Sequence, residues 1–163
     1  MVIRRCRFYT VSYTHLDNQE VEQLIRTCLL EFNANKPGCA WEDPNLGQFF
    51  QVYQPMNMQY LVVENEGHIV GGCGIGPVEG KDDVCELQKM YCLLETRGTG
   101  IAQQLLDLSL DFAKKHYSKC YLETFENMVA ANKFYIKNGF QLLDKPIVDG
   151  PHFACDKWYI KDL

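Results

Sequence analysis

Apolar residues recur at helical spacing in four stretches of the chain, with polar residues between them. An apolar residue at every third or fourth position gives a helix one face that can pack on a core. Asp17, followed three residues later by Glu20, is typical of a helix N-cap with a capping box. The predicted helices cover residues 17–32, 101–113 and 128–137, with a shorter one around residues 46–53.

The remaining apolar segments have the pattern of β-strands. Alternation with a period of two places successive side chains on opposite faces of a sheet. Glu66-Gly67 is predicted to be the turn of a hairpin. Six of the predicted strands cover residues 3–11, 59–65, 68–78, 84–94, 119–124 and 152–160.

The order of these elements predicts the fold class. It is strand, two helices, three strands, helix, strand, helix and two final strands. Antiparallel strands therefore come first, and a strand-helix-strand crossover follows. We expect an α+β or mixed α/β fold with one mixed, mostly antiparallel sheet of about six to seven strands and about four helices. No repeat or linker interrupts the chain, which predicts a single domain over residues 1–163.

Composition and charge exclude several classes of partner. The chain is 47% hydrophobic and 23% charged, as is typical of a globular domain. Its formal net charge of -5 and pI of about 5.3 argue against a nucleic-acid partner, which requires a basic face. No apolar run approaches the ~18 residues that span a bilayer. The N-terminal segment also lacks the apolar region of a secretory signal, so we expect no membrane partner.

Eight cysteines require an explanation in a chain of this length. No Cys-x-x-Cys pair occurs, so the usual zinc and thioredoxin patterns are absent from the sequence. Most of the cysteines lie among apolar neighbours in predicted helices and strands. We therefore expect no metal site, and reduced thiols that serve as small hydrophobic residues in the cytoplasm.

An arginine and two glycines, in the sequence RGTGIA over residues 97–102, directly precede the third long helix. A helix N-terminus has backbone amides without partners and a partial positive charge, and glycines let a diphosphate approach closely. The alternative is a tight turn in which Gly98 and Gly100 only relieve steric crowding. The segment has no Gly-Lys-Ser/Thr and no Gly-x-Gly-x-x-Gly, so it is neither a Walker A loop nor a dinucleotide fingerprint.

The segment MYCLLETRGTGIAQQLL, residues 90–106, resembles the acyl-CoA segment of the GNAT superfamily of acetyl-CoA-dependent N-acetyltransferases, with Arg97, Gly100 and Ala102 at the fixed places. ENMVAANKFYIKNGF, residues 126–140, is similar to the family's later Asn…Ala…Phe/Leu-Tyr-x-x-x-Gly-Phe helix. Two departures are visible. Leu94 replaces a frequent proline, and Asn127 lies eight residues before Tyr135, where many members have seven.

The resemblance implies a binding site for acetyl-CoA as cosubstrate. It implies that the strand near Met90, Tyr91 and Cys92 offers its backbone to the pantetheine arm. The diphosphate would lie on the backbone amides of the turn, and either Asn127 or Asn132 would contact the cofactor. The residues of the turn are Arg97, Gly98, Thr99, Gly100, Ile101 and Ala102.

The resemblance also implies direct acetyl transfer to an amine in a ternary complex. Tyr135 would then protonate the thiolate leaving group, and the alternative for this residue is a core tyrosine. Glu86 is the candidate base, and the alternative is a solvated or ion-paired glutamate. Alternation places Glu86, Gln88 and Met90 on one face of their strand.

Two other functions stay open at this stage. One is a non-catalytic acyl-CoA-binding or sensor module. The other is a thiol enzyme built on Cys155 with His152 as its base. The acceptor of an acetyltransferase would be a small-molecule or peptide amine. The acidic turn at Glu79, Asp82 and Asp83 could attract such a cation, but the favoured interpretation of this turn is a solvated acidic loop. Members of the family often form homodimers, and nothing in the sequence decides the oligomeric state.

Overall fold

The predicted order of helices and strands is confirmed in the computed structural model, which describes residues 2–6 and 16–163. The strands are β1 (Val2–Cys6), β2 (Gln59–Asn65), β3 (His68–Val78), β4 (Lys81–Cys92), β5 (Lys119–Thr124), β6 (Gln141–Leu143) and β7 (Lys157–Asp162). The helices are α1 (Leu16–Glu31), α2 (Phe49–Val52), α3 (Ile101–Ala113) and α4 (Val129–Lys137), with 3-10 turns η1 (Ala40–Glu42) and η2 (Leu94–Thr96).

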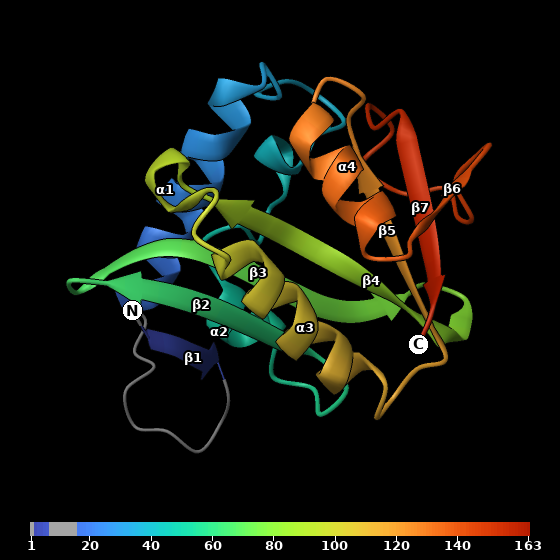
Figure 1. Cartoon of the computed structure of the whole chain (residues 1–163), viewed down its shortest axis with the longest axis horizontal. Coiled ribbons are helices and arrows are strands. Elements are labelled where there is room, and N and C mark those ends of the chain that lie inside the picture. Colours follow the sequence, from blue (N-terminus) through green and yellow to red (C-terminus); the bar gives the residue numbers. More distant parts are fainter. Residues whose placement is uncertain (1, 7–15) are drawn as a thin grey trace.

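Within the described residues, seven strands form one mixed sheet in the order β1-β2-β3-β4-β5-β7-β6. Every neighbouring pair is antiparallel except β4 and β5, which are parallel and joined by α3. Figure 1 shows α3 lying across one face of the sheet and α1 on the opposite side. The predicted mixed, mostly antiparallel sheet is therefore confirmed.

Each face of the sheet has its own hydrophobic core, because successive side chains of a strand point to opposite faces. Leu61 and Val63 of β2 pack in the core under α3 and α4. Tyr60 and Val62 of the same strand pack in the core under α1 and α2. Fully burying a leucine or isoleucine side chain contributes about 1.5–3 kcal/mol. The two cores hold α3 and α4 against one face of the sheet and α1 and α2 against the other, so helices cover both faces of the sheet.

The glycine-rich strand β3 accommodates two tyrosine rings on the α1 face. A Cβ atom at Gly72 would lie 2.6 Å from the Tyr60 hydroxyl oxygen, and one at Gly74 would lie 2.5 Å from that of Tyr53. Both contacts are too short for any side chain larger than hydrogen. These glycines therefore serve packing in the α1 core.

Several element boundaries differ from their predictions. The first long helix begins at Leu16, so Asp17 lies inside its first turn and is not the N-cap. The Glu20 carboxylate accepts a hydrogen bond from the Ile69 backbone amide at 3.0 Å, so the predicted capping box was wrong. Of the predicted strand 3–11, residues 7–11 lie outside the described residues.

The final strand also begins later than predicted. Residues 152–156 form a turn in which the Cys155 amide donates a hydrogen bond to the His152 carbonyl oxygen at 3.0 Å. Strand β7 begins only at Lys157. Among the helices of the described residues, no helix combines the length and the apolar character needed to cross a membrane.

Candidate active site

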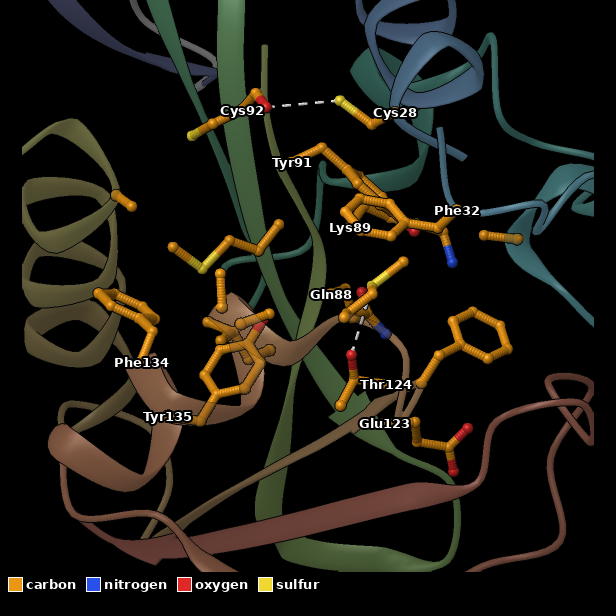
Figure 2. A pocket seen from close by; sticks show the side chains of 18 of the residues that line it. Cys28, Phe32, Gln88, Lys89, Tyr91, Cys92, Glu123, Thr124, Phe134 and Tyr135 are labelled. Carbon is orange, nitrogen blue, oxygen red and sulfur yellow. Dashed lines mark hydrogen bonds between the residues drawn. The ribbon is translucent and has the colours of Figure 1, made fainter. Parts of the chain in front are cut away.

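Strands β4 and β5 separate along their length and leave a wedge-shaped opening in the sheet. Their ladder joins residues 84–86 to residues 119–121, although β4 continues to Cys92 and β5 to Thr124. Beyond this ladder the edge of β4 that faces β5 has no strand partner among the described residues. Figure 2 shows the cavity that fills this opening, and its volume is about 350 Å³. Its walls come from β4, β5, α4 and the C-terminal end of α1.

A β-bulge in β4 lies at the centre of the wedge. The register with β3 shifts between Gly72 and Gly74, and Lys89 adopts a left-handed φ of 50°. A bulge adds one residue to a strand and reverses the alternation after it. Met90 accordingly packs in the α3 core with Leu87, whereas Tyr91 packs in the α1 core. The prediction that Met90 shares a face with Glu86 and Gln88 was therefore wrong.

The two glycines of the turn before α3 both adopt left-handed backbone conformations. The φ angles are 76° at Gly98 and 88° at Gly100. A Cβ atom built on either glycine meets no atom within 4 Å, so the space in front of the turn is open. Gly100 is the N-cap of α3 and has no side chain that could satisfy the first amides of the helix. The turn thus presents backbone to an open space.

Not all six amides of this turn are free to bind a ligand. The Arg97 amide donates to the Leu94 carbonyl oxygen at 3.2 Å, and the Thr99 amide donates to Thr96 at 3.4 Å. The other four amides donate to no residue that the structure describes, and they belong to Gly98, Gly100, Ile101 and Ala102. Unpaired amides at a helix N-terminus form a binding site for anions such as a diphosphate. The residues present therefore fit the diphosphate of a CoA molecule.

The guanidinium group of Arg97 connects the turn to α1 and β4. It forms two hydrogen bonds with the Glu31 carboxylate, at 2.5 and 2.7 Å, and two with the Cys92 carbonyl oxygen, at 3.1 and 3.2 Å. It also lies 5.8 Å from the centroid of the Phe32 ring. These contacts hold the start of the turn against the last turn of α1.

Tyr135 extends from α4 into the cavity, as Figure 2 shows. Its ring is buried and packs against the rings of Phe134, Phe140 and Tyr159. Its hydroxyl group forms no hydrogen bond with any residue described. Burial, with smaller contributions from nearby thiols, raises the pKa of this hydroxyl above its usual value. The group is therefore protonated near neutral pH and available to a ligand.

Glu86 lies on β4 where the wedge begins, and Glu123 lies beside it on β5. Side-chain oxygens of these two glutamates come within 4.8 Å of one another. The Gln88 amide donates to Glu86 at 2.9 Å, and the Tyr121 hydroxyl donates to Glu123 at 2.7 Å. Burial raises the pKa of Glu123, and the charge of Glu86 acts in the same direction. The site thus contains two carboxylates where the sequence predicted one.

Glu123 is the functional candidate that the sequence analysis missed. It stands in the short apolar strand KCYLET, where an acidic residue is unusual. This unusual acidic residue was the signal in the sequence that could have identified Glu123 as a functional candidate. The proximity of Glu123 to Glu86 depends on the parallel pairing of β4 with β5, which the sequence alone does not give.

A charged cluster closes the wedge on the side of α2. The Lys89 ammonium lies 2.5 Å from the Asp43 carboxylate, and His152 Nε2 lies 2.9 Å from the same group. Burial raises the pKa of Asp43, but the His152 hydrogen bond and the Lys89 charge outweigh it, so the net shift is downward. The cluster joins three segments that are distant in the sequence.

Glu86, Glu123 and His152 could each offer one ligand atom to a cation. The His152 Nε2 atom, however, already lies 2.9 Å from the Asp43 carboxylate. The expectation that the site contains no metal stays a prediction.

Cys155 also lines the cavity, but its surroundings oppose thiolate chemistry. Burial raises the pKa of this thiol to about 12, and the charge of Glu123 contributes in the same direction. His152, the proposed base for this thiol, binds Asp43 with its Nε2 atom.

The two asparagines considered for cofactor binding lie outside the walls of this cavity. The Asn132 amide donates to the carbonyl oxygens of Phe125 and Met128 at 2.8 and 2.9 Å, and its oxygen accepts from the Tyr159 hydroxyl at 2.7 Å. The Asn127 amide donates to the Phe32 carbonyl oxygen at 3.1 Å. In this structure both side chains bind the protein itself, and a contact of either with a cofactor stays a prediction.

Comparison with known proteins identifies a family to which the chain is similar. An Acetyltransferase (GNAT) domain model matches residues 57–142, which is more than half of the chain. The protein described as uncharacterized N-acetyltransferase YjgM of Escherichia coli (strain K12) is 37% identical over 151 residues, covering 90% of each chain.

Solved structures share the fold at lower identity. A GNAT-family acetyltransferase from Staphylococcus aureus has a TM-score of 0.81 at 22% identity, covering 99% of each chain. The yncA protein of Salmonella typhimurium, solved with its cofactor acetyl-CoA, has a TM-score of 0.73 at 16% identity, covering 99% of this chain and 93% of that one. The family model and the relative from Escherichia coli show that this chain belongs to the GNAT acetyltransferase family.

Proposed function

We propose that this protein transfers the acetyl group of acetyl-CoA to an amine by direct attack within a ternary complex. One observation carries the proposal. The wedge between β4 and β5 joins the free amides of the glycine turn to Tyr135, Glu86 and Glu123 in a single region of the molecule. A binding site for an anionic carrier and a set of proton-transfer groups thus lie together.

Backbone atoms supply most of the binding site for acetyl-CoA. The free amides of the turn before α3 would hold the diphosphate, whose charge the partial positive end of the helix favours. The unpaired edge of β4 over residues 87–92 would pair with the amides of the pantetheine arm in the manner of an added strand. Acetyl-CoA itself supplies the thioester that the amine attacks.

The two carboxylates would remove the proton that blocks attack. An acceptor ammonium must lose one proton to become a nucleophile, and Glu86 or Glu123, directly or through water, is positioned to take it. The C–N bond then forms as the C–S bond breaks, and the nitrogen releases a second proton to solvent as the neutral amide forms. Glu86 is the preferred base because it lines the cavity at the point where the β4–β5 ladder ends.

Tyr135 would complete the proton balance. The thiolate that leaves the acetyl carbon takes a proton from the Tyr135 hydroxyl, and solvent restores that proton afterwards. The position of this tyrosine supports the role, since it lines the cavity and its hydroxyl forms no hydrogen bond with any residue described.

The other candidate functions have less support. A pure acyl-CoA-binding module has no use for two half-buried carboxylates that line the same cavity as a tyrosine hydroxyl. An acyl-cysteine mechanism requires an accessible thiolate, and the Cys155 thiol has a pKa of about 12. The seven cysteines whose side chains the structure describes are free thiols, which supports the expectation of a cytoplasmic protein.

The decisive experiment measures release of free CoA thiol from acetyl-CoA in the presence of a panel of amines. We expect thiol release that depends on at least one amine. Tyr135→Phe should lower kcat by about 10²–10⁴-fold, as loss of a general acid does, without changing the affinity for CoA. Tight CoA binding with no amine-dependent release across the panel would favour the binding module instead.

A further inference from the structure

A second cavity, of about 370 Å³, adjoins the first at the wedge. It lies between the α2 region, the β3–β4 hairpin and the loop before β7. Five residues line both cavities, namely Glu86, Gln88, Lys89, Glu123 and His152. The candidate catalytic carboxylates therefore stand at the junction, with the acetyl-CoA cavity on one side and the second cavity on the other.

The walls of the second cavity combine apolar surface with negative charge. Phe49, Val52 and Val148 provide apolar wall. Asp43 forms an ion pair with Lys89 and a hydrogen bond with His152, as described above. Four further carboxylates of the wall form no ion pair with any residue described, and they belong to Glu79, Glu86, Glu123 and Asp149. The cavity thus attracts cations, and its apolar walls suit a hydrocarbon chain.

These four carboxylates form two groups that lie apart. Glu86 and Glu123 are half-buried at the junction, whereas Glu79 and Asp149 are exposed. Gly76 of β3 lies opposite Glu86, and Glu79 comes three residues after Gly76. Strand β3 ends at Val78, so Glu79 lies in the β3–β4 turn, beyond the end of the strand that pairs with Glu86.

We propose that the second cavity is the acceptor site, and that its acceptor is an aliphatic diamine or polyamine. One amine reacts at Glu86 and Glu123, and a second cationic amine binds at Glu79 or Asp149, which line the exposed part of the same cavity. The methylene chain between them lies along the apolar wall. This inference rests on the proposed function and adds a substrate class to it.

The test compares two acceptors of equal chain length, 1,7-diaminoheptane and heptylamine. They differ only in the second amine, so the ratio of their kcat/KM values isolates the second charge. We expect the diamine to be favoured by about tenfold at low ionic strength, because each exposed ion pair with the second amine adds a modest attraction. Added salt should reduce the ratio, since these carboxylates are exposed.

Variants identify the carboxylates that recognise the second amine. In the double variant Glu79→Gln/Asp149→Asn, the ratio should fall toward one. Both residues are exposed, so the substitutions leave the core unchanged. The matched control is Glu66→Gln/Asp111→Asn, which removes two exposed carboxylates that line neither cavity. This control should keep the ratio of the wild-type protein.

Binding measurements separate the failure of this inference from the failure of the proposed function. Calorimetric titration of the CoA-bound protein should show tighter binding of 1,7-diaminoheptane than of heptylamine, whether or not acetyl transfer follows. Equal binding and equal kcat/KM of the two amines would overturn the diamine site and leave the acetyltransferase intact. If the protein acetylated other amines but neither of these two, the diamine site would likewise be overturned and the acetyltransferase would stand. Preferential diamine binding without any thiol release would support the acceptor site and contradict the proposed function.

Discussion

At the scale of single residues, the candidate site contains charged groups whose burial lowers the stability of the folded protein. Glu123 is the clearest of them, because its carboxylate is half-buried beside a second carboxylate. Burial raises its pKa, and the charge of Glu86 acts in the same direction. The hydrogen bond from Tyr121 and the charges of His152 and Lys89 lower the pKa, but the net shift is upward. A carboxylate with a raised pKa is a stronger base than one in water. A base that removes a proton from an ammonium benefits from such a shift. The same residue should therefore be unfavourable for stability.

Replacing Glu123 with glutamine tests this cost. Because its pKa is raised in the folded state, the native protein binds the proton more tightly than the unfolded chain does. The stabilisation from that proton is complete below the pKa of the unfolded chain, and it is lost as the pH rises through the folded-state pKa. Glu123→Gln should therefore have a higher melting temperature than the wild type near neutral pH. The difference should shrink below pH ~4, where the wild-type carboxyl group is protonated.

Thermal melts across this pH range make the comparison directly. Glu66→Gln, in the exposed β2–β3 turn, is the matched control and should change the melting temperature little at any pH. If Glu123→Gln were less stable than the wild type near neutral pH, the prediction would be wrong. The Tyr121 hydrogen bond would then stabilise the fold by more than burial of the Glu123 charge destabilises it.

At the scale of elements, regular patterns were predictable and local departures from them were not. Strands β2, β3 and β5 have the predicted bounds, because alternating and apolar runs mark them directly. The bulge at Lys89 was not predictable, because no residue type marks it and it depends on the register between β3 and β4. That bulge moved Met90 to the other face of the sheet.

The candidate site likewise combines features that the sequence predicts with features that depend on the tertiary structure. The turn before α3 was predictable from its glycines and its place in front of a helix. That only four of its amides are free depends on internal hydrogen bonds of the turn, which the sequence does not display. The pairing of Glu86 with Glu123 and of Asp43 with Lys89 joins residues from separate elements, and only the tertiary structure brings these partners together.

The glycine turn permits a test in which strain and ligand binding are separated. Gly100 and Gly80 both have a left-handed φ, of 88° and 72°, and a Cβ atom at either meets no atom within 4 Å. Gly100→Ala and Gly80→Ala should therefore share a similar loss of stability, about 1–2 kcal/mol. Only Gly100→Ala places a methyl group where the diphosphate would approach.

We expect Gly100→Ala to weaken CoA binding by about 10- to 100-fold, the equivalent of one lost hydrogen bond to a charged group. Gly80→Ala, in the β3–β4 turn, should bind CoA like the wild type. Calorimetric titration of CoA gives the affinities, and thermal melts give the stabilities. Equal CoA affinities in the two variants would mean that Gly100 serves only the geometry of the turn.

At the scale of the whole molecule, the open wedge interrupts a sheet that is otherwise continuously paired. The cores under α1 and α3 hold β4 from both faces, so the strand stays in place although part of its edge has no partner. An unpaired strand edge in the interior of a sheet costs backbone hydrogen bonds. A ligand that pairs with this edge should recover them and join the two halves of the sheet.

Hydrogen exchange with and without ligand tests this coupling. In the free protein, the amides of Gly98, Gly100, Ile101 and Ala102 should exchange rapidly, as should the β4 amides that face the wedge. Saturating CoA should slow exchange in both groups, because its diphosphate binds the turn and its pantetheine arm binds β4. ADP carries a diphosphate without the arm, so it should protect the turn and leave β4 exchanging as before. If CoA protected the turn alone, the pantetheine arm would not lie along β4, and the placement of the thioester beside Tyr135 would lose its support.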